Sequence, residues 1–298
     1  MSRPGRVLVV GDVVNDVVVR PHGPPAHGTD TPSEIRLTPG GQGGNQAAWL
    51  AFLGAPVRFA GRAGAADAEA HRRALEALGA EVHLSADLSV PTGTIVVVVE
   101  GSGERSMLTD RGAGARLSAD DLPPGLLDGV AHVHLSGYVL FEEAGRTAAL
   151  ALVAEARRRG LEVSLDPASA AGLALAGAET FLRWVRGCRL TFPNLDEGRL
   201  LTGHETPSRV LDTLLAHFDE VALKLGPDGA LCGTADGLRV EVPAAEATVL
   251  DSTGAGDAFA AGYLTSRLAG GSLADRAAAA VSAAALALGT FGGRPPAG

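Results

Sequence analysis

Apolar and polar positions along the chain follow two patterns that alternate. Short β-branched runs, such as RVLVVG at 6–11 and LEVSLDP at 161–167, predict buried strands. Helical stretches that stop at a glycine follow several of these runs, as at 45–54 and 68–79. The alternation predicts an α/β fold with a mostly parallel central sheet and helices on both faces. Further strands of this kind, each followed by a helical stretch, are expected at 57–64, 131–137, 189–194 and 220–226.

A second pattern interrupts the first in the N-terminal third of the chain. Residues 92–110 form two extended runs around a Gly-Ser-Gly turn, which is a hairpin signal. Two more extended segments are not followed at once by a helix. We therefore expect one domain over residues 1–298, with a small antiparallel β lid built from segments at about 12–20, 33–38 and 94–110. The valine-rich hairpin predicts a homodimer through the lid, because exposed strand edges favour pairing.

Composition narrows the class of function. The chain has 298 residues, a net charge of −9 and only 4% aromatic residues. A nucleic-acid groove would need a basic stripe and stacking rings, so no nucleic-acid partner is expected. The longest apolar run, at 277–289, is too short for a bilayer span, and no membrane partner is expected. Two cysteines without a partner motif and the lack of a signal peptide predict a cytoplasmic protein.

The segment DSTGAGD at 251–257 carries the first candidate chemistry. Gly254, Ala255 and Gly256 precede Asp257, and an alanine-rich helix follows. Small residues let a ligand approach the backbone, and the first amides of a helix attract anions such as phosphate. An aspartate beside a bound phosphate suits a general base that takes a proton from an attacking alcohol. The alternative is an aspartate that only caps the helix.

A second glycine cluster, PGGQGGN at 39–45, also precedes a helix. Gly41, Gly43 and Gly44 would let the hydroxyls of a polyol reach the backbone, and Asn45 would hydrogen-bond them. The alternative is a loop followed by an asparagine cap.

The two clusters together resemble the two signatures of the PfkB, or ribokinase-like, carbohydrate kinases. Gly40, Gly41, Gly43, Asn45, Ala47, Gly54 and Gly64 fall in register with the first signature. DSTGAGD matches the second, with Ser252 in a threonine position. The resemblance implies a ribokinase-like three-layer sandwich with a β lid. It also implies phosphorylation of a small alcohol by ATP with Mg²⁺.

The resemblance also implies roles for individual residues. Asp257 is expected to be the catalytic base, and the amides of residues 254–257 form the anion hole. Asp16 is expected to bind substrate hydroxyls. The alternative is that Asp16 is an acid on a lid strand whose side chain faces water. Asn194 and Glu197 are expected near the phosphates and Mg²⁺, with Glu197 in contact through water. A helix start with an acid in its first turn is the alternative for this pair.

The remaining implied sites lie toward the C-terminus. Gly226 and Gly229 would give room to the nucleotide, and Lys224 would touch phosphate or reach water. Asp251 and Thr253 match a monovalent-cation site, such as one for K⁺, completed by backbone near 286–292. The segment 289–298 resembles a closing loop beside the adenine.

The acceptor stays open at this point. Arg111 follows the lid hairpin in a context similar to that of 2-keto-3-deoxygluconate kinases, and its guanidinium would suit a carboxylate. Tyr138 replaces a glutamate of ribokinase that holds the sugar. A ribose-, fructose- or 2-keto-3-deoxygluconate-like acceptor therefore fits the sequence.

Two rival functions remain beside the sugar kinase. A nucleoside kinase of the same fold would need rings around the base, and the lid has few. A non-catalytic sugar- or nucleotide-binding protein would not need Asp257. A dinucleotide-binding dehydrogenase is excluded, because the first strand ends in GDVVND and lacks Gly-x-Gly-x-x-Gly.

Two pairs outside these motifs have structural interpretations. His132 and His134 lie on one face of a strand without a visible third ligand, which predicts hydrogen-bonded core or edge histidines. Trp49 and Phe52 lie at helical spacing, which predicts core packing.

Overall fold

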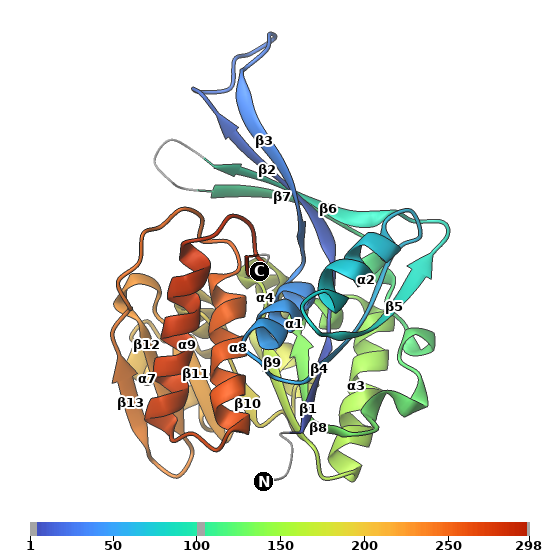
Figure 1. Cartoon of the computed structure of the whole chain (residues 1–298). Helices are drawn as coiled ribbons and strands as arrows, with labels where there is room; N and C mark the ends of the chain where they lie inside the picture. Colours follow the sequence, from blue (N-terminus) through green and yellow to red (C-terminus); the bar gives the residue numbers. More distant parts are fainter. Residues whose placement is uncertain (1–4, 100–104, 297–298) are drawn as a thin grey trace.

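A computed structural model describes residues 5–99 and 105–296, in which one large sheet carries a smaller sheet above it (Figure 1). The strand order of the large sheet is β13-β12-β11-β10-β9-β8-β1-β4-β5, and all pairs from β11 to β5 run parallel. Its strands are β1 (Arg6–Val10), β4 (Val57–Gly64), β5 (Glu81–Asp87), β8 (Val130–Ser136), β9 (Glu162–Asp166), β10 (Leu190–Thr191), β11 (Glu220–Lys224), β12 (Ala230–Thr234) and β13 (Arg239–Val242).

Helices cover both faces of this sheet. In β1, Val7 and Val9 point into one hydrophobic core while Leu8 and Val10 point into the other, as alternation along a strand requires. The first core packs against α1 (Gln42–Phe52), α2 (Ala68–Glu76), α8 (Ala255–Leu268) and α9 (Leu273–Leu288). The second packs against α3 (Glu143–Arg158), α4 (Ala170–Ala176), α5 (Ala178–Trp184), α6 (Leu195–Thr202) and α7 (Pro207–Leu214). The predicted three-layer α/β fold is confirmed.

The expectation of a helix after every parallel strand is wrong at β11. This strand is followed by a short 3-10 turn and then by β12, which pairs with it antiparallel. Gly226 and Gly229 have φ values of 61° and 93°, and Pro227 lies between them. Glycines with positive φ around a proline close a tight turn, so the chain reverses there and does not enter a helix.

The smaller sheet is the lid. Its order is β3-β2-β6-β7, with strands β2 (Val14–Pro21), β3 (Ser33–Gly40), β6 (Thr92–Val99) and β7 (Arg105–Gly112). The β2–β3 and β6–β7 pairs are antiparallel, whereas the central β2–β6 pair is parallel. The Gly-Ser-Gly turn expected at 101–103 lies outside the described residues. Both edge strands carry exposed leucines, Leu37 at 77% and Leu108 at 66%.

The prediction for the two histidines is confirmed, whereas the prediction for the two aromatic residues is confirmed only for Trp49. His132 and His134 are buried, and both hydrogen-bond to the hydroxyl of Ser164, as expected for structural histidines. Trp49 is fully buried, but Phe52 is 42% exposed and packs edge-on against the indole. Helical spacing puts the two rings on one side of α1, but only Trp49 belongs to the buried core. No helix in the described part of the chain combines the length and the apolar character that a membrane span requires.

Candidate active site

The site lies where α8 begins, beside the carboxyl ends of the parallel strands, which is the usual ligand position in open α/β sheets. Gly254 precedes α8 in a left-handed conformation, with φ of 77°. A Cβ at this position would lie 2.3 Å from the carbonyl oxygen of Gly293. Only glycine therefore allows the C-terminal segment to pack against the mouth of the helix.

Asp257 lies in the first turn of α8, and it does not cap the helix. The N-cap residue is Gly254, which makes no side-chain cap. Asn45 Nδ2 donates a hydrogen bond of 3.0 Å to Asp257 Oδ2. Burial raises the pKa of Asp257 well above its usual value, and the hydrogen bond from Asn45 works in the opposite direction. The capping alternative fails here, because this carboxylate faces a partner from a distant part of the chain.

Asn45 is also not a helix cap. α1 begins at Gln42 after the N-cap residue Gly41, which has φ of 93°. A Cβ on Gly41 would lie 2.6 Å from Val13 Cα, and one on Gly43 would lie 2.6 Å from Gly11 Cα. The glycines therefore press α1 against the chain that leaves β1, and this packing directs Asn45 toward Asp257.

A cavity of about 200 Å³ joins the predicted acceptor residues. Its lining includes Asp16, Gly41, Asn45, Ile95, Val97, Met107, Arg111, Tyr138, Thr253, Gly254 and Asp257. The lid strands thus supply apolar side chains and also two charged ones, Asp16 on β2 and Arg111 on β7. Gly43 and Gly44 are not part of this lining: the Gly43 amide donates to Asp12 Oδ1, and the Gly44 amide donates to the carbonyl of Asp12.

Asp16 is buried in this cavity wall, with 4% of its surface exposed. Burial raises its pKa to about 7, with a further increase from Asp12. A lid-strand acid that faces water is therefore excluded as the explanation of Asp16.

Sequence reasoning missed Asp12, which organises one side of the site. Its carboxylate accepts hydrogen bonds from the Gly43 amide at 3.3 Å and from Arg111 Nη1 at 3.0 Å. The guanidinium of Arg111 also lies over the ring of Tyr138, 3.4 Å from its centroid. The acidic residue directly after the first strand, in GDVVND, was the available signal.

The Arg111–Tyr138 pair separates the acceptor cavity from a second cavity of about 250 Å³. Both residues line the two cavities. The far cavity has apolar walls from Val139, Phe141 and Leu175, with Thr109 and Ser169 as polar groups.

A larger cavity of about 560 Å³ lies on the other side of the α8 mouth. Lys224, Gly226, Gly229 and Gly256 line it. Alanine, valine and leucine side chains from residues 244–249 and from α9 provide most of the remaining surface. A cavity of this volume with mostly apolar walls is typical of a small-molecule site. Lys224 does not reach water freely, because its Nζ lies 2.7 Å from Asp166 Oδ2.

Asn194 and Glu197 form a reciprocal cap at the start of α6. The Asn194 side chain accepts from the Glu197 amide, and the Glu197 carboxylate accepts from the Asn194 amide, both at 2.8 Å. Burial raises the pKa of Glu197 to about 7, while Lys224 nearby has the opposite effect. The structural alternative therefore holds for this pair. Within the described residues, no group of three or more histidine, cysteine or acidic side chains could hold a metal ion.

Asp251 and Thr253 lie together in the loop before α8. Asp251 Oδ1 accepts from the amide and the hydroxyl of Thr253, and Oδ2 accepts from the amide of Gly292 at 3.1 Å. The carbonyl of Leu288 accepts from the amides of Leu250 and Asp251. The structure thus brings this loop against residues 288–292, as a shared cation site would require.

The closing segment packs against α1 and the mouth of α8 through Gly293. Leu288 lines the large cavity, but Gly293 packs between Asn45 and Gly254, and its carbonyl accepts from Trp49 Nε1 at 3.0 Å. Gly293 therefore borders the acceptor cavity, and the expected contact of this segment with adenine stays a prediction. The sequence pattern gave no sign of the contact with Trp49, since the two residues are 244 positions apart.

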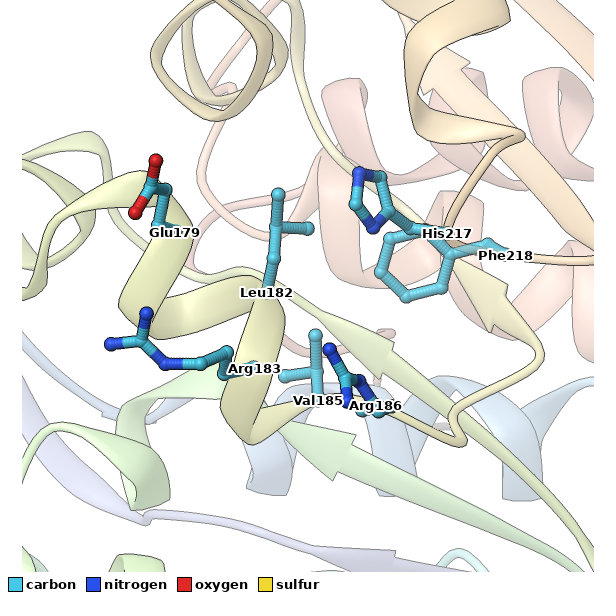
Figure 2. A pocket seen from close by; sticks show the side chains of 7 residues that line it. All are labelled: Glu179, Leu182, Arg183, Val185, Arg186, His217 and Phe218. Atoms are coloured by element: carbon cyan, nitrogen blue, oxygen red, sulfur yellow. The ribbon is translucent and has the colours of Figure 1, made fainter.

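Figure 2 shows a further cavity of about 340 Å³, between α5 and residues 217–218. Its lining is Glu179, Leu182, Arg183, Val185, Arg186, His217 and Phe218. It shares no residue with the cavities around α8, and none of the predicted site residues belongs to it.

Comparison with known proteins decides the family. The profile described as pfkB family carbohydrate kinase matches residues 5–297. The chain belongs to this family. Members of the pfkB family are phosphotransferases that use an alcohol group as acceptor. The resemblance inferred from the two glycine clusters is confirmed.

Individual relatives carry several different names. An ATP-dependent ribose-1-phosphate kinase from Halopiger xanaduensis is 31% identical over 301 residues, which cover 97% of this chain and 94% of the relative. A bifunctional protein HldE from Shewanella amazonensis is 31% identical over 96% of this chain, and the match spans 60% of the relative's length. A ribokinase from Arabidopsis thaliana is 30% identical over 97% of this chain and 77% of the relative.

Solved structures share the fold. An adenosine kinase from Sinorhizobium meliloti superimposes with a TM-score of 0.90 at 24% identity, covering 98% of this chain and 96% of the other. A putative ribokinase II from E. coli in complex with ATP and Mg²⁺ gives 0.86 at 22% identity, covering 97% and 94%.

Proposed function

We propose that this pfkB family member transfers the γ-phosphoryl group of ATP to a hydroxyl of a small sugar or sugar acid, with Asp257 as the general base. One observation carries the proposal: the Asp257 carboxylate lies at the mouth of α8, in the same cavity as Asp16 and beside Asn45. A proton acceptor and a hydroxyl-binding acid thus face one small space.

The proposed reaction follows from the properties of these groups. Asp16 accepts hydrogen bonds from hydroxyls of the acceptor and Asn45 orients the base. Asp257 takes the proton from the attacking hydroxyl, and burial supports this step, because a raised pKa strengthens a carboxylate as a base. The first-turn amides of α8, from Gly254, Ala255, Gly256 and Asp257, stabilise charge on the transferring group.

ATP fits across the mouth of α8. Its adenine would occupy the cavity of about 560 Å³ beside Gly226 and Gly229, and its phosphates would point toward Lys224 and Gly256. A Cβ on Gly256 would lie 3.4 Å from Lys224 Nζ, so the lysine is close to the proposed anion hole. Burial acts to lower the pKa of Lys224, but Asp166 and Glu197 outweigh it, so the pKa is raised and the ammonium stays charged.

Two cations complete the proposal. Mg²⁺ would neutralise charge on the phosphates of ATP. Glu197 and Asn194 would contact the ion through water, because their side chains already cap α6. A K⁺ ion would bind beside Asp251 and Thr253 and strengthen the positive field at the helix mouth.

The charges around the cavity do not select among the acceptor candidates. Arg111 is already paired with Asp12, so its guanidinium does not by itself demand an acidic acceptor. Ribose, fructose and 2-keto-3-deoxygluconate stay as candidates, and the Halopiger relative adds ribose-1-phosphate.

A nucleoside kinase is the second candidate, favoured by the cavity of about 250 Å³ beyond Arg111 and Tyr138. A base attached to a bound ribose would have room there, between Phe141 and Leu175. A coupled assay of ADP release decides among these acceptors. The panel is ribose, ribose-1-phosphate, fructose, 2-keto-3-deoxygluconate, adenosine and cytidine. Binding of an acceptor without ADP release from any would instead support a non-catalytic sugar-binding protein.

A further inference from the structure

The C-terminal segment contains an arginine, Arg294, that sequence reasoning did not single out. Arg294 is 9% exposed, although a guanidinium is always charged in a protein. Its Nε, Nη1 and Nη2 atoms have no hydrogen-bond partner among residues 5–99 and 105–296. Isolated buried charge is costly, so a compensating group is expected nearby.

The backbone that leads to Arg294 is held firmly against α1. The carbonyl of Gly293 accepts from Trp49, and a Cβ on Gly293 would lie 2.2 Å from Asn45 Nδ2. The guanidinium itself lies beside the first turn of this helix, with Nη2 2.9 Å from where a Cβ on Gly44 would lie. A helix N-terminus carries partial positive charge, so α1 does not compensate the arginine.

Asp16 is the acid beside the segment that carries Arg294. Its cross-strand partner in the lid is Thr38, whose hydroxyl lies 3.1 Å from where a Cβ on Gly292 would lie. The Asp16 carboxylate is buried, and the charges of Asp12, Asp251, Arg294 and Arg111 act on it. Burial and the two acids raise the pKa of Asp16, and the two arginines lower it, with Arg294 the stronger of them. Arg111 has its own partner in Asp12.

The remaining neighbour does not share this role. His71 on α2 bonds to Asn15, the residue before Asp16. Burial, together with the charge of Arg294, lowers the pKa of His71 to about 4, so the imidazole is neutral at physiological pH. Of the neighbours considered, Arg294 is therefore the cation that can offset the negative charge of Asp16.

We propose that Arg294 is a positioning residue that keeps Asp16 ionised and directed at the acceptor hydroxyls. A protonated Asp16 would accept fewer hydrogen bonds and would hold the acceptor less tightly. The role in acceptor binding rests on the proposed function of Asp16, whereas the charge pairing does not.

The kinetic test compares Arg294→Met and Arg294→Lys with the parent over pH 5.5–9. In Arg294→Met, we expect the acid limb of kcat/KM for the acceptor to move upward by about one pH unit, which is about a tenfold loss at pH 6 and little at pH 9. We expect KM for ATP to stay unchanged. In Arg294→Lys, the acid limb of kcat/KM should lie close to that of the parent. Arg58→Met is the matched control, since this buried arginine is fully bonded to Glu81 and to backbone carbonyls.

Two kinetic outcomes would overturn the proposal. If kcat/KM for the acceptor fell by the same factor at every pH in Arg294→Met, Arg294 would have only a structural role. A loss confined to acceptors that carry a phosphate or carboxylate would mean that Arg294 contacts the acceptor and not Asp16.

A second test needs no activity. The melting temperatures of Asp16→Asn, Arg294→Met and the double variant are measured at pH 8. Each single change leaves one buried charge without its counterpart, so we expect non-additive effects, with the double variant melting higher than the sum of the two single shifts predicts. Additive losses would refute the pairing. Coupling in a protein that phosphorylates no acceptor would uphold the pairing and refute only the proposed function.

Discussion

Replacing Asp257 with asparagine removes the proposed base and keeps the shape of the side chain. The new amide oxygen can still accept the hydrogen bond that Asn45 Nδ2 donates at 3.0 Å. The change therefore separates the chemistry of the carboxylate from its contacts.

The expected loss follows from the role of a positioned base. General bases contribute about 10²–10⁴-fold, which corresponds to about 2.7–5.5 kcal/mol of activation free energy. We expect kcat to fall by this amount, while the dissociation constant for ATP changes less than about threefold, because the nucleotide cavity lies on the other side of the α8 mouth.

The folded state of Asp257→Asn should be more stable than that of the parent at pH 8, although its kcat falls. Because burial raises the pKa of Asp257, the folded state holds a proton that the unfolded state loses above its usual pKa of about 4. The free energy of unfolding in the parent thus falls as pH rises from about 4 toward the raised pKa, and Asp257→Asn lacks this decrease. The variant should melt higher than the parent at pH 8, and the difference should shrink at pH 5.

The assay is ADP release at saturating acceptor, with ATP binding by calorimetry and melting curves at both pH values. Asp275→Asn is a matched control, because Asp275 occupies the same first-turn position of α9 but lies far from the cavities and only caps the helix with Ser272. A kcat of Asp257→Asn close to that of the parent would refute the role of Asp257 as general base. A lower melting temperature at pH 8 would refute the electrostatic argument.

Three further changes test other parts of the site. Gly254→Ala should abolish most turnover and lower the melting temperature more than Gly270→Ala, since both have φ near +80° but only the first would clash with neighbouring backbone. If Asp251 helps to hold K⁺, activity should rise severalfold when K⁺ replaces Na⁺, and Asp251→Asn should lose this response; equal rates in both salts would contradict the site. Leu37→Glu and Leu108→Glu should convert a lid-mediated dimer to monomer in sedimentation velocity, and a monomeric parent would exclude that dimer.

Much of the site could be predicted because its signals are local. A helix that opens with Gly254 and carries an acid in its first turn is readable from a few consecutive residues, and so is the glycine loop before Asn45. Strand positions were readable from β-branched runs, and the β11 error arose where glycine and proline outweighed the expected crossover helix.

Other features could not be predicted from local signals. Helical spacing grouped Phe52 with Trp49, but coverage of that face depends on segments elsewhere in the chain. The cap formed by Asn194 and Glu197 was foreseeable, yet the same residues could equally have faced a ligand. Which outcome holds depends on where the neighbouring loops lie.

The sequence by itself determined the alternation of strands and helices, the glycine turns that can approach a ligand, and the two acids, Asp16 and Asp257, that suit an alcohol kinase. Only the tertiary structure decided which side chains meet: Asn45 with Asp257 across 212 positions, and Asp12 with Arg111 across 99. It also decided that Arg294 lies buried near Asp16. The physical reason is that backbone preferences act over a few residues, whereas burial and charge pairing depend on which distant segments pack together.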